Sequence, residues 1–193
     1  MGENATGAPL SVSGRLKVVG TIVVILLAVW AAALGGRILL DRTGPPEYPA
    51  SDVRDWATFA DHLVLGTAGP ADTDRFDVTT VLWSRQGAHP IGRRIAVESE
   101  MTTGEAYAVP VAWLDDGSSD GRWVALAADA VIPLEGGRLD PDAAAGGGAT
   151  WAAEHAGESP RTLATELYET GPHPAAVPYL YESLEQRLAA VER

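Results

Sequence analysis

The stretch that decides the fold reads FDVTTVLW and runs from Phe76 to Trp83. Apolar and polar residues alternate along it almost to its end, which is typical of a β-strand with one buried face. A helix does not fit this pattern, because its buried positions recur every three or four residues. The stretch therefore predicts a strand, and the sequence on either side indicates the fold that contains it.

Other short strand-like runs, separated by turn signals, lie on both sides of this stretch. They are residues 62–67 before it and residues 94–97, 105–114, 122–126 and 130–134 after it. Pro110 predicts an edge strand or a bulge within 105–114, because proline has no N–H to donate to a neighbouring strand. Five or six short strands at this spacing predict a small antiparallel β-barrel or sandwich.

Helical patterns flank the strands, so the fold class expected is mainly β with flanking helices. Ser51 is expected to cap a short helix before the first strand. Two carboxyl-terminal helices follow the strands, the first with Ser159 as its cap and Pro160 at its first position. The second begins near Pro178, and its apolar residues recur at steps of three and four: Tyr181, Leu184, Leu188 and Val191. These two helices are expected to pack on the domain or on a partner.

An apolar run near the amino terminus predicts a transmembrane helix. Nineteen residues from Val18 to Gly36 carry no charge, and apolar residues resume after Arg37. At about 1.5 Å per residue such a run crosses the roughly 30 Å hydrocarbon core of a bilayer. Positions along the predicted span are Val18, Ile22, Leu26, Trp30, Leu34 and Leu39. A cleaved signal peptide with small residues at Ala31–Ala33 is the alternative, and both interpretations export the rest of the chain.

The chain divides into six predicted parts. These are a disordered cytoplasmic tail (1–17), a transmembrane helix (18–40), a proline-rich spacer (41–50), an exported barrel-like domain (51–139), a flexible linker (140–158) and a helical segment (159–193). Arginines and a lysine flank both ends of the span, so charge fixes the orientation only weakly. We expect a single-pass protein of the cell membrane, with its amino terminus in the cytoplasm and its domain outside.

Composition excludes several classes of function. The 193 residues include no cysteine, which removes disulfide frameworks, thiolate zinc sites and cysteine nucleophiles. The net charge is −12, and residues 51–193 hold 23 acidic and 10 basic side chains. A protein that binds nucleic acid needs a basic face, so we expect no nucleic-acid partner. No cofactor motif is present.

Three local patterns resemble the opening of small exported OB-like barrels of the netrin or tissue-inhibitor type. They are Phe59–Thr67, then Phe76–Trp83, and later Tyr107–Pro110 with Arg122–Trp123. The layout is also similar to that of uncharacterised single-pass membrane proteins of high-GC Gram-positive bacteria, and thirteen arginines to one lysine suit such a source. The resemblance covers residues 56–135 and implies a fold but no activity. Tissue inhibitors act through an amino-terminal cysteine, which this chain lacks.

Ser119 lies in a match to the G-x-S-x-G motif of serine hydrolases. That mechanism needs a strand before the serine and a helix after it. The residues after Ser119 read as a strand instead, and a Ser/Gly/Asp hairpin loop explains the whole match. A membrane-tethered hydrolase using Ser119 is therefore the alternative hypothesis rather than the leading one.

Acidic turns raise the possibility of a calcium-responsive sensor. Two groups supply carboxylates: Asp72, Asp74 and Asp77, and Asp115, Asp116 and Asp120. Neither follows the spacing of a known calcium loop. The four histidines are scattered without metal-ligand spacing, and His62 beside Asp61 is expected to be a polar strand end.

Four of the six tryptophans, Trp56, Trp83, Trp113 and Trp123, are expected to fill the core. Trp151 lies in a glycine-rich region and is interpreted either as an anchor of that region or as a contact for a ligand or partner. The leading hypothesis is a membrane-anchored, non-enzymatic binding or assembly module of the cell envelope. Its expected partners are the lipid bilayer and another envelope protein bound through the carboxyl-terminal helices.

Overall fold

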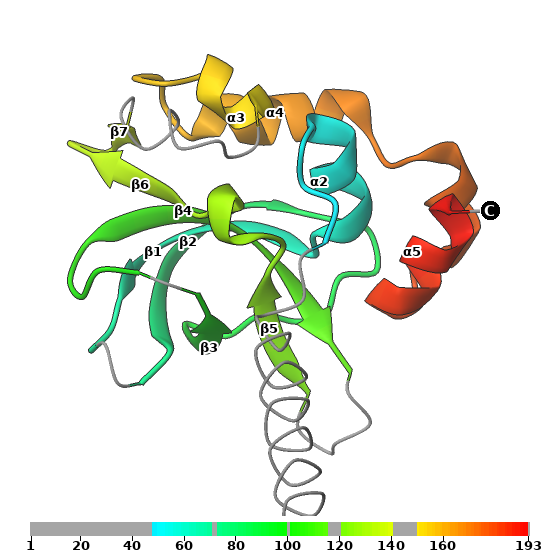
Figure 1. The fold of residues 1–193 in the computed structure, drawn as a ribbon, viewed down its shortest axis with the longest axis horizontal. Coiled ribbons are helices and arrows are strands. Elements are labelled where there is room, and N and C mark those ends of the chain that lie inside the picture. Colours follow the sequence, from blue (N-terminus) through cyan, green and yellow to red (C-terminus); the bar gives the residue numbers. More distant parts are fainter. Residues whose placement is uncertain (1–47, 71–72, 100, 116–120, 141–149, 193) are drawn as a thin grey trace, which may run out of the picture. The chain divides into compact units, whose positions relative to one another are not determined.

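The structure is a computed structural model that describes residues 48–70, 73–99, 101–115, 121–140 and 150–192 (Figure 1). The predicted tail, the membrane span and residues 41–47 of the spacer lie outside these ranges, and so do Ser119 and residues 141–149 of the linker. Within the described ranges no helix has the length and apolar character needed to span a bilayer.

Five strands close into a barrel in the order β1-β2-β3-β5-β4, with β4 pairing back to β1. All of these pairings are antiparallel except β3 with β5, which is parallel. The barrel form of the prediction is thus confirmed. The strands are β1 (His62–Ala68), β2 (Arg75–Ser84), β3 (Arg94–Glu98), β4 (Ala106–Leu114) and β5 (Arg122–Ala125). A small hairpin of β6 (Ile132–Glu135) and β7 (Arg138–Leu139) extends the sheet beyond β4.

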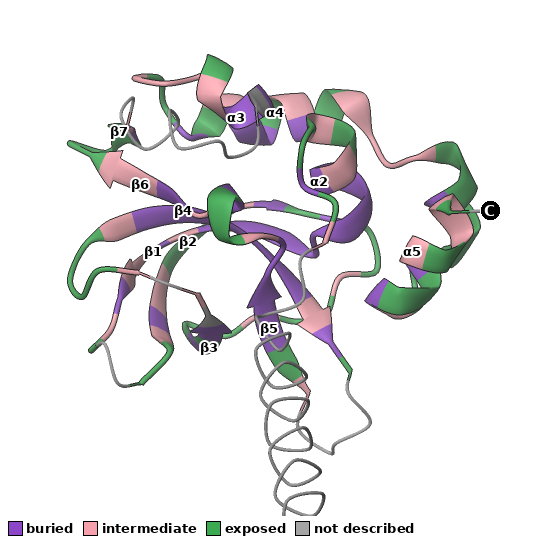
Figure 2. Ribbon diagram, in the orientation of Figure 1, coloured by how far each residue is buried: buried purple, intermediate pink, exposed green. Residues whose placement is uncertain are grey.

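Strand β4 separates two apolar clusters. Tyr107, Val109 and Val111 join a cluster that draws residues from all five barrel strands, so this cluster fills the barrel. Ala108 and Ala112 face the other way and join a cluster shared with the helices. Both faces of β4 are therefore buried, as Figure 2 shows, and its sequence is almost continuously apolar.

Pro110 lies inside this buried strand, so the prediction of an edge strand is wrong. In a strand the N–H and C=O of one residue point to the same side, and the carbonyl of Pro110 accepts a hydrogen bond from Leu126 N. On that side β4 pairs with β5 from Val111 onward and with β6 up to Ala108. The missing donor of Pro110 therefore falls in the gap between two partner strands, where no ladder bond is needed.

The helices cover one side of the barrel, with α2, α3 and α4 lying together above the strands in Figure 1. They are α2 (Val53–Phe59), α3 (Thr150–Glu154), α4 (Arg161–Thr170) and α5 (Leu184–Val191), with short 3₁₀ helices η1 (Ala128–Ala130) and η3 (Pro174–Tyr179). Buried positions on α2 and α4, among them Trp56, Leu163 and Leu167, belong to the cluster shared with the sheet. This pairing buries the apolar stripe of each helix.

The amino-terminal cap of α2 differs from the prediction. Asp52, not Ser51, accepts the hydrogen bond from the backbone N–H of Asp55, at 2.8 Å. The Ser51 hydroxyl donates instead to the Asp55 carboxylate. Immediately before the helix, Tyr48 N donates to Leu126 O and Ala50 is buried, so this end of the predicted spacer packs on the domain.

The carboxyl-terminal region also departs from the prediction in part. Helix α4 forms as expected, one residue later, and ends at Gly171, whose φ of +65° suits glycine. Residues 150–154 of the predicted linker form α3. Helix α5 begins after Ser183, which caps it in a capping box with Gln186, so Tyr181 precedes the helix and is exposed instead of lying on its apolar face.

Candidate functional site

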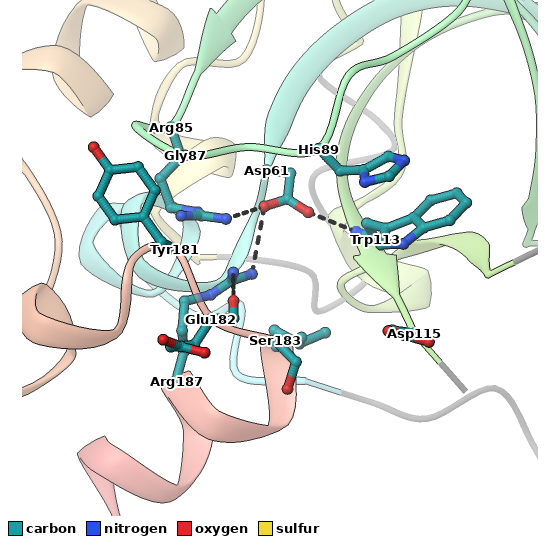
Figure 3. A pocket seen from close by; sticks show the side chains of 11 residues that line it. Asp61, Arg85, Gly87, His89, Trp113, Asp115, Tyr181, Glu182, Ser183 and Arg187 are labelled. Atoms are coloured by element: carbon teal, nitrogen blue, oxygen red, sulfur yellow. Dashed lines mark hydrogen bonds and ion pairs between the residues drawn. The ribbon is translucent and has the colours of Figure 1, made fainter. Parts of the chain in front are cut away.

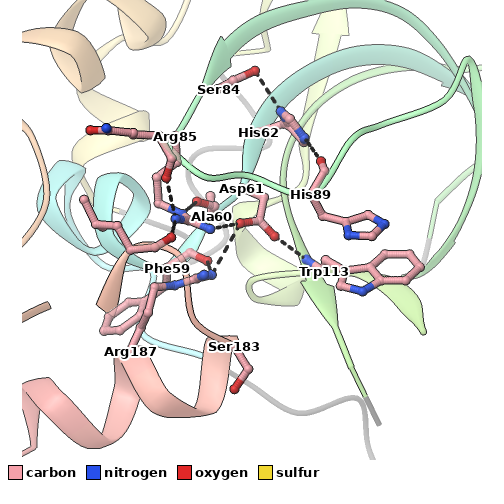
Figure 4. Close-up of polar contacts among 12 residues, drawn as sticks. Phe59, Ala60, Asp61, His62, Ser84, Arg85, His89, Trp113, Ser183 and Arg187 are labelled. Carbon is pink, nitrogen blue, oxygen red and sulfur yellow. Dashed lines mark hydrogen bonds and ion pairs between the residues drawn. The ribbon is translucent and has the colours of Figure 1, made fainter. Parts of the chain in front are cut away.

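Three charged side chains from distant parts of the sequence meet where α5 contacts the barrel (Figure 4). Asp61 lies between α2 and β1, Arg85 follows β2, and Arg187 lies on α5. One Asp61 oxygen accepts from Arg85 and lies 3.5 Å from an Arg187 nitrogen, and the other accepts from Trp113 N at 2.7 Å. We refer to Asp61, Arg85 and Arg187 as the ionic network.

The side chains of the ionic network are almost inaccessible to solvent. The side chains of Asp61 and Arg187 are each 2% exposed and that of Arg85 is 4% exposed. Two guanidinium groups face one carboxylate, so one positive charge has no ionic partner within the network. The arginines donate to five backbone carbonyls that share this charge: Phe59, Ala60, Gln86, Leu180 and Glu182. Two of these carbonyls lie at the carboxyl end of α2, where the helix dipole favours cations.

Of the two arginines, Arg187 is the one whose buried charge is incompletely compensated. Its Nε is buried and has no hydrogen-bond partner among the described residues. Burial, followed by repulsion from Arg85, lowers the pKa of Arg187 to about 10. Because a buried charge without a full set of partners is costly, Arg187 depends on Asp61 for its stability in this position.

A pocket of about 290 Å³ lies beside the ionic network (Figure 3). Tyr181 stands on one side of the pocket, and Trp113, covered by His89, stands on the other. His89 and Trp113 are stacked, with ring centroids 4.0 Å apart and planes 3° apart. The pocket thus has aromatic groups on two sides, one from the segment before α5 and one from the barrel.

Tyr181 is held in place although 71% of its surface is exposed. Gln86 Nε2 donates to its hydroxyl at 2.7 Å. Its ring lies against Gly87, where an added Cβ would come within 2.6 Å of it, and Gly87 also has a φ of +75°. An exposed aromatic ring that is already oriented loses little side-chain entropy on binding a ligand.

His62 fixes the loop that carries His89. Its Nε2 lies 2.7 Å from the carbonyl oxygen of His89 and must donate, since a carbonyl only accepts. Nδ1 then accepts from the Ser84 hydroxyl at 2.8 Å. Burial lowers the pKa of His62, which favours this neutral form. His62 begins β1, as the sequence predicted.

The charged groups at the mouth of the pocket differ from those beneath it. Glu182 and Asp115 line the pocket and are exposed, whereas Arg85 and Arg187 are buried. A ligand in the pocket would therefore contact carboxylates and aromatic rings before guanidinium groups.

A second hollow of about 350 Å³ lies between α4, the loop after it and β2. Tyr168, which is exposed, and Pro172 line it together with the buried Leu167 and Leu180. It extends the surface of the carboxyl-terminal region away from the pocket.

Trp151 lies on α3 and is 8% exposed. Its ring meets that of Trp56 edge to face, with centroids 4.9 Å apart, and its Nε1 donates to Glu166. This position favours an anchoring role over a contact with a ligand. The other tryptophans of the described chain are buried as predicted at positions 56, 83 and 123, and half-buried at position 113.

The described residues show the surroundings of the alternative sites predicted from the sequence. Strands β4 and β5, which flank the segment containing Ser119, pair antiparallel with Leu114 opposite Arg122, as in a hairpin. A nucleophile elbow would need a helix in place of β5. Asp77, one of the calcium candidates, is already paired with Arg75 and Arg94. Across the part of the chain that the structure describes, no three or more acidic or histidine side chains are grouped to hold a metal ion.

Sequence reasoning did not find Arg85 or Arg187. A signal for Arg187 was present, because residues 184, 187, 188 and 191 form one continuous stripe on a helix and Arg187 is the only charged member. No comparable signal marks Arg85, which reaches Asp61 from 24 positions away.

Comparisons of the chain with protein-family models, with curated proteins and with solved structures find no match.

Proposed function

We propose that the protein is a membrane-anchored, non-enzymatic binding or assembly module of the cell envelope. The uncharged run from Val18 to Gly36 supports the anchor, because it is long enough to cross a bilayer as a helix. The closed five-stranded barrel agrees with an OB-like exported domain, a fold that serves as a binding scaffold in many settings.

The observation that carries the proposal is the pocket shared by the barrel and the residues before α5. Its aromatic sides are oriented in advance, by the stacking of His89 on Trp113 and by the contacts of Tyr181 with Gln86 and Gly87. Rings fixed in this way are typical of surfaces that bind a partner. Besides Tyr181 at the pocket, Tyr168 and Tyr179 of the carboxyl-terminal region are exposed, which agrees with a partner bound through this region.

Site-specific cross-linking in native membranes tests the proposal. A photoreactive phenylalanine derivative replaces Tyr181 in the full chain, and the same group replaces Val81, an exposed residue on β2, as the control. We expect a discrete cross-linked product from position 181 and none of the same size from position 81. Equal labelling from both positions, or none from either, would remove the support for a binding face at the pocket.

A further inference from the structure

The surface from residue 162 to residue 192 combines aromatic rings with carboxylates. Its exposed charged side chains are all glutamates, since Arg187 is buried. The members of this acidic tyrosine face are Tyr168, Glu169, Tyr179, Tyr181, Glu182 and Glu185. Tyrosine is enriched in protein interfaces, and carboxylates beside it favour a partner of positive charge.

We propose that the pocket takes a lysine or arginine side chain of a basic polypeptide partner, and that the acidic tyrosine face contacts the residues around it. This inference rests on the proposed binding function and names the chemistry of its partner. A cation in the pocket could lie against the exposed ring of Tyr181, which attracts it, and beside the Glu182 carboxylate. No interaction with another described residue occupies the Glu182 carboxylate.

The surplus positive charge of the ionic network limits how deeply the cation can enter. Arg85 and Arg187 line the pocket, although their side chains are almost fully buried, and a cation that approached them would be repelled. The exposed carboxylates Glu182 and Asp115 lie at the mouth. The cation is therefore held at the mouth of the pocket, because the positive charge of Arg85 and Arg187 opposes deeper entry.

The same charges disfavour an anionic partner at this face. Nucleic acid and anionic lipid headgroups would meet the glutamates first, and the chain as a whole carries a net charge of −12. A basic polypeptide gains from both the local carboxylates and the overall field, so electrostatic attraction raises its rate of association.

Titration with short capped peptides tests this inference. The full chain in detergent is titrated with a peptide of alternating glycine and arginine and with a matched peptide of glycine and glutamate, and tryptophan fluorescence or calorimetry reports binding. We expect the arginine peptide to bind and the glutamate peptide not to bind. Added salt should weaken the interaction, since exposed charges are screened.

Matched variants locate the contact. Glu182→Gln is expected to weaken binding about two- to fivefold. Tyr181→Ala is expected to weaken it by about the same factor, while Tyr181→Phe keeps the ring and most of the affinity. Glu135→Gln makes the same change of charge at the exposed last residue of β6 and should leave binding unchanged.

Two outcomes would overturn the inference. One is preferential binding of the glutamate peptide, which would assign an anion to the pocket. The other is equal loss of binding in Glu182→Gln and Glu135→Gln, which would leave only non-specific attraction to an acidic protein. Should the arginine peptide fail to bind while cross-linking from position 181 persists, the basic partner is excluded and the binding module stands.

Discussion

Helices α4 and α5 both pack near α2, but they are attached by different kinds of contact. Leu163, Ala164 and Leu167 of α4 are buried in the apolar cluster that contains Trp56. Helix α5 begins with the buried Leu184, but its next inward residue is Arg187, which donates to Phe59 O and lies beside Asp61. Apolar contacts tolerate small shifts, whereas the hydrogen bonds of a buried guanidinium require one geometry. The difference suggests that the ionic network fixes the position of the carboxyl-terminal residues that form one side of the pocket.

The largest effect is expected from removing the one carboxylate of the network. Asp61→Asn leaves Arg85 and Arg187 buried without an anionic partner, so we expect it to lower the free energy of unfolding by about 3–5 kcal/mol. Chemical denaturation of the folded domain measures this change.

Arg187→Met is the matched variant. It removes the surplus charge and the unpartnered Nε, and leaves Asp61 paired with Arg85. We expect it to reduce stability by less than about 1.5 kcal/mol. Equal losses in the two variants would contradict the view that charge imbalance dominates this contact.

The apolar contact is tested by Leu167→Ala. Leu167 is almost fully buried between α4 and α2, so the cavity left by the substitution should lower the free energy of unfolding by about 2–5 kcal/mol. Unlike Asp61→Asn, this variant should keep the contacts of Tyr181, and its affinity for the arginine peptide should be unchanged. A loss of affinity equal to that of Tyr181→Ala would show that the two contacts are not independent.

A smaller effect is expected at the amino-terminal cap of α2. Asp52→Ala removes the side chain that accepts from Asp55 N and should destabilise the domain by about 1 kcal/mol. Ser51→Ala, one residue earlier, should have the smaller effect, because the Ser51 hydroxyl donates to the exposed Asp55 carboxylate and does not cap a backbone N–H of the first turn. The reverse order in thermal unfolding would restore Ser51 as the cap.

The smallest effect is a change in pH dependence. Because burial lowers the pKa of His62, the folded value lies below the unfolded value of about 6.5. The stability that this neutral histidine contributes is therefore present above the unfolded pKa, and is lost as the pH falls through the folded pKa. Thermal unfolding of His62→Gln should show a shallower acid dependence than the wild type over this range. The same pH dependence in the variant and the wild type would show that neutral His62 does not stabilise the loop that carries His89.

Much of the barrel could be predicted from the sequence. The observed bounds of β1, β2, β4 and β5 differ from the predicted bounds by only a residue or two. Pro110 led to the wrong prediction of an edge strand. Whether its missing N–H disrupts pairing depends on which strands lie beside it, and this is decided by the closed barrel. Helix α3 is too short to show a period, and its stability comes from the contact of Trp151 with Trp56.

The site was harder to predict than the fold. Tyr181 continues the spacing of Leu184 and Leu188, but the capping box at Ser183 starts the helix after it and leaves the ring on the surface. Hydrophobic periodicity cannot report a buried ion pair between residues that are far apart in the sequence. Only Arg187, a charge within an apolar stripe, offered a sign of the network.

Native-state hydrogen exchange in Asp61→Asn tests most directly whether the ionic network holds the carboxyl-terminal side of the pocket. We predict that amides of η3 and α5 become the fastest to exchange in this variant, while those of β1 and β4 lose protection only as far as global stability falls and remain the most protected. Arg187→Met, which removes the network's contact with α5, should also speed exchange in α5. Unchanged protection of η3 and α5 in Asp61→Asn, or protection in η3 and α5 that stays equal to that of β1 and β4, would contradict the claim.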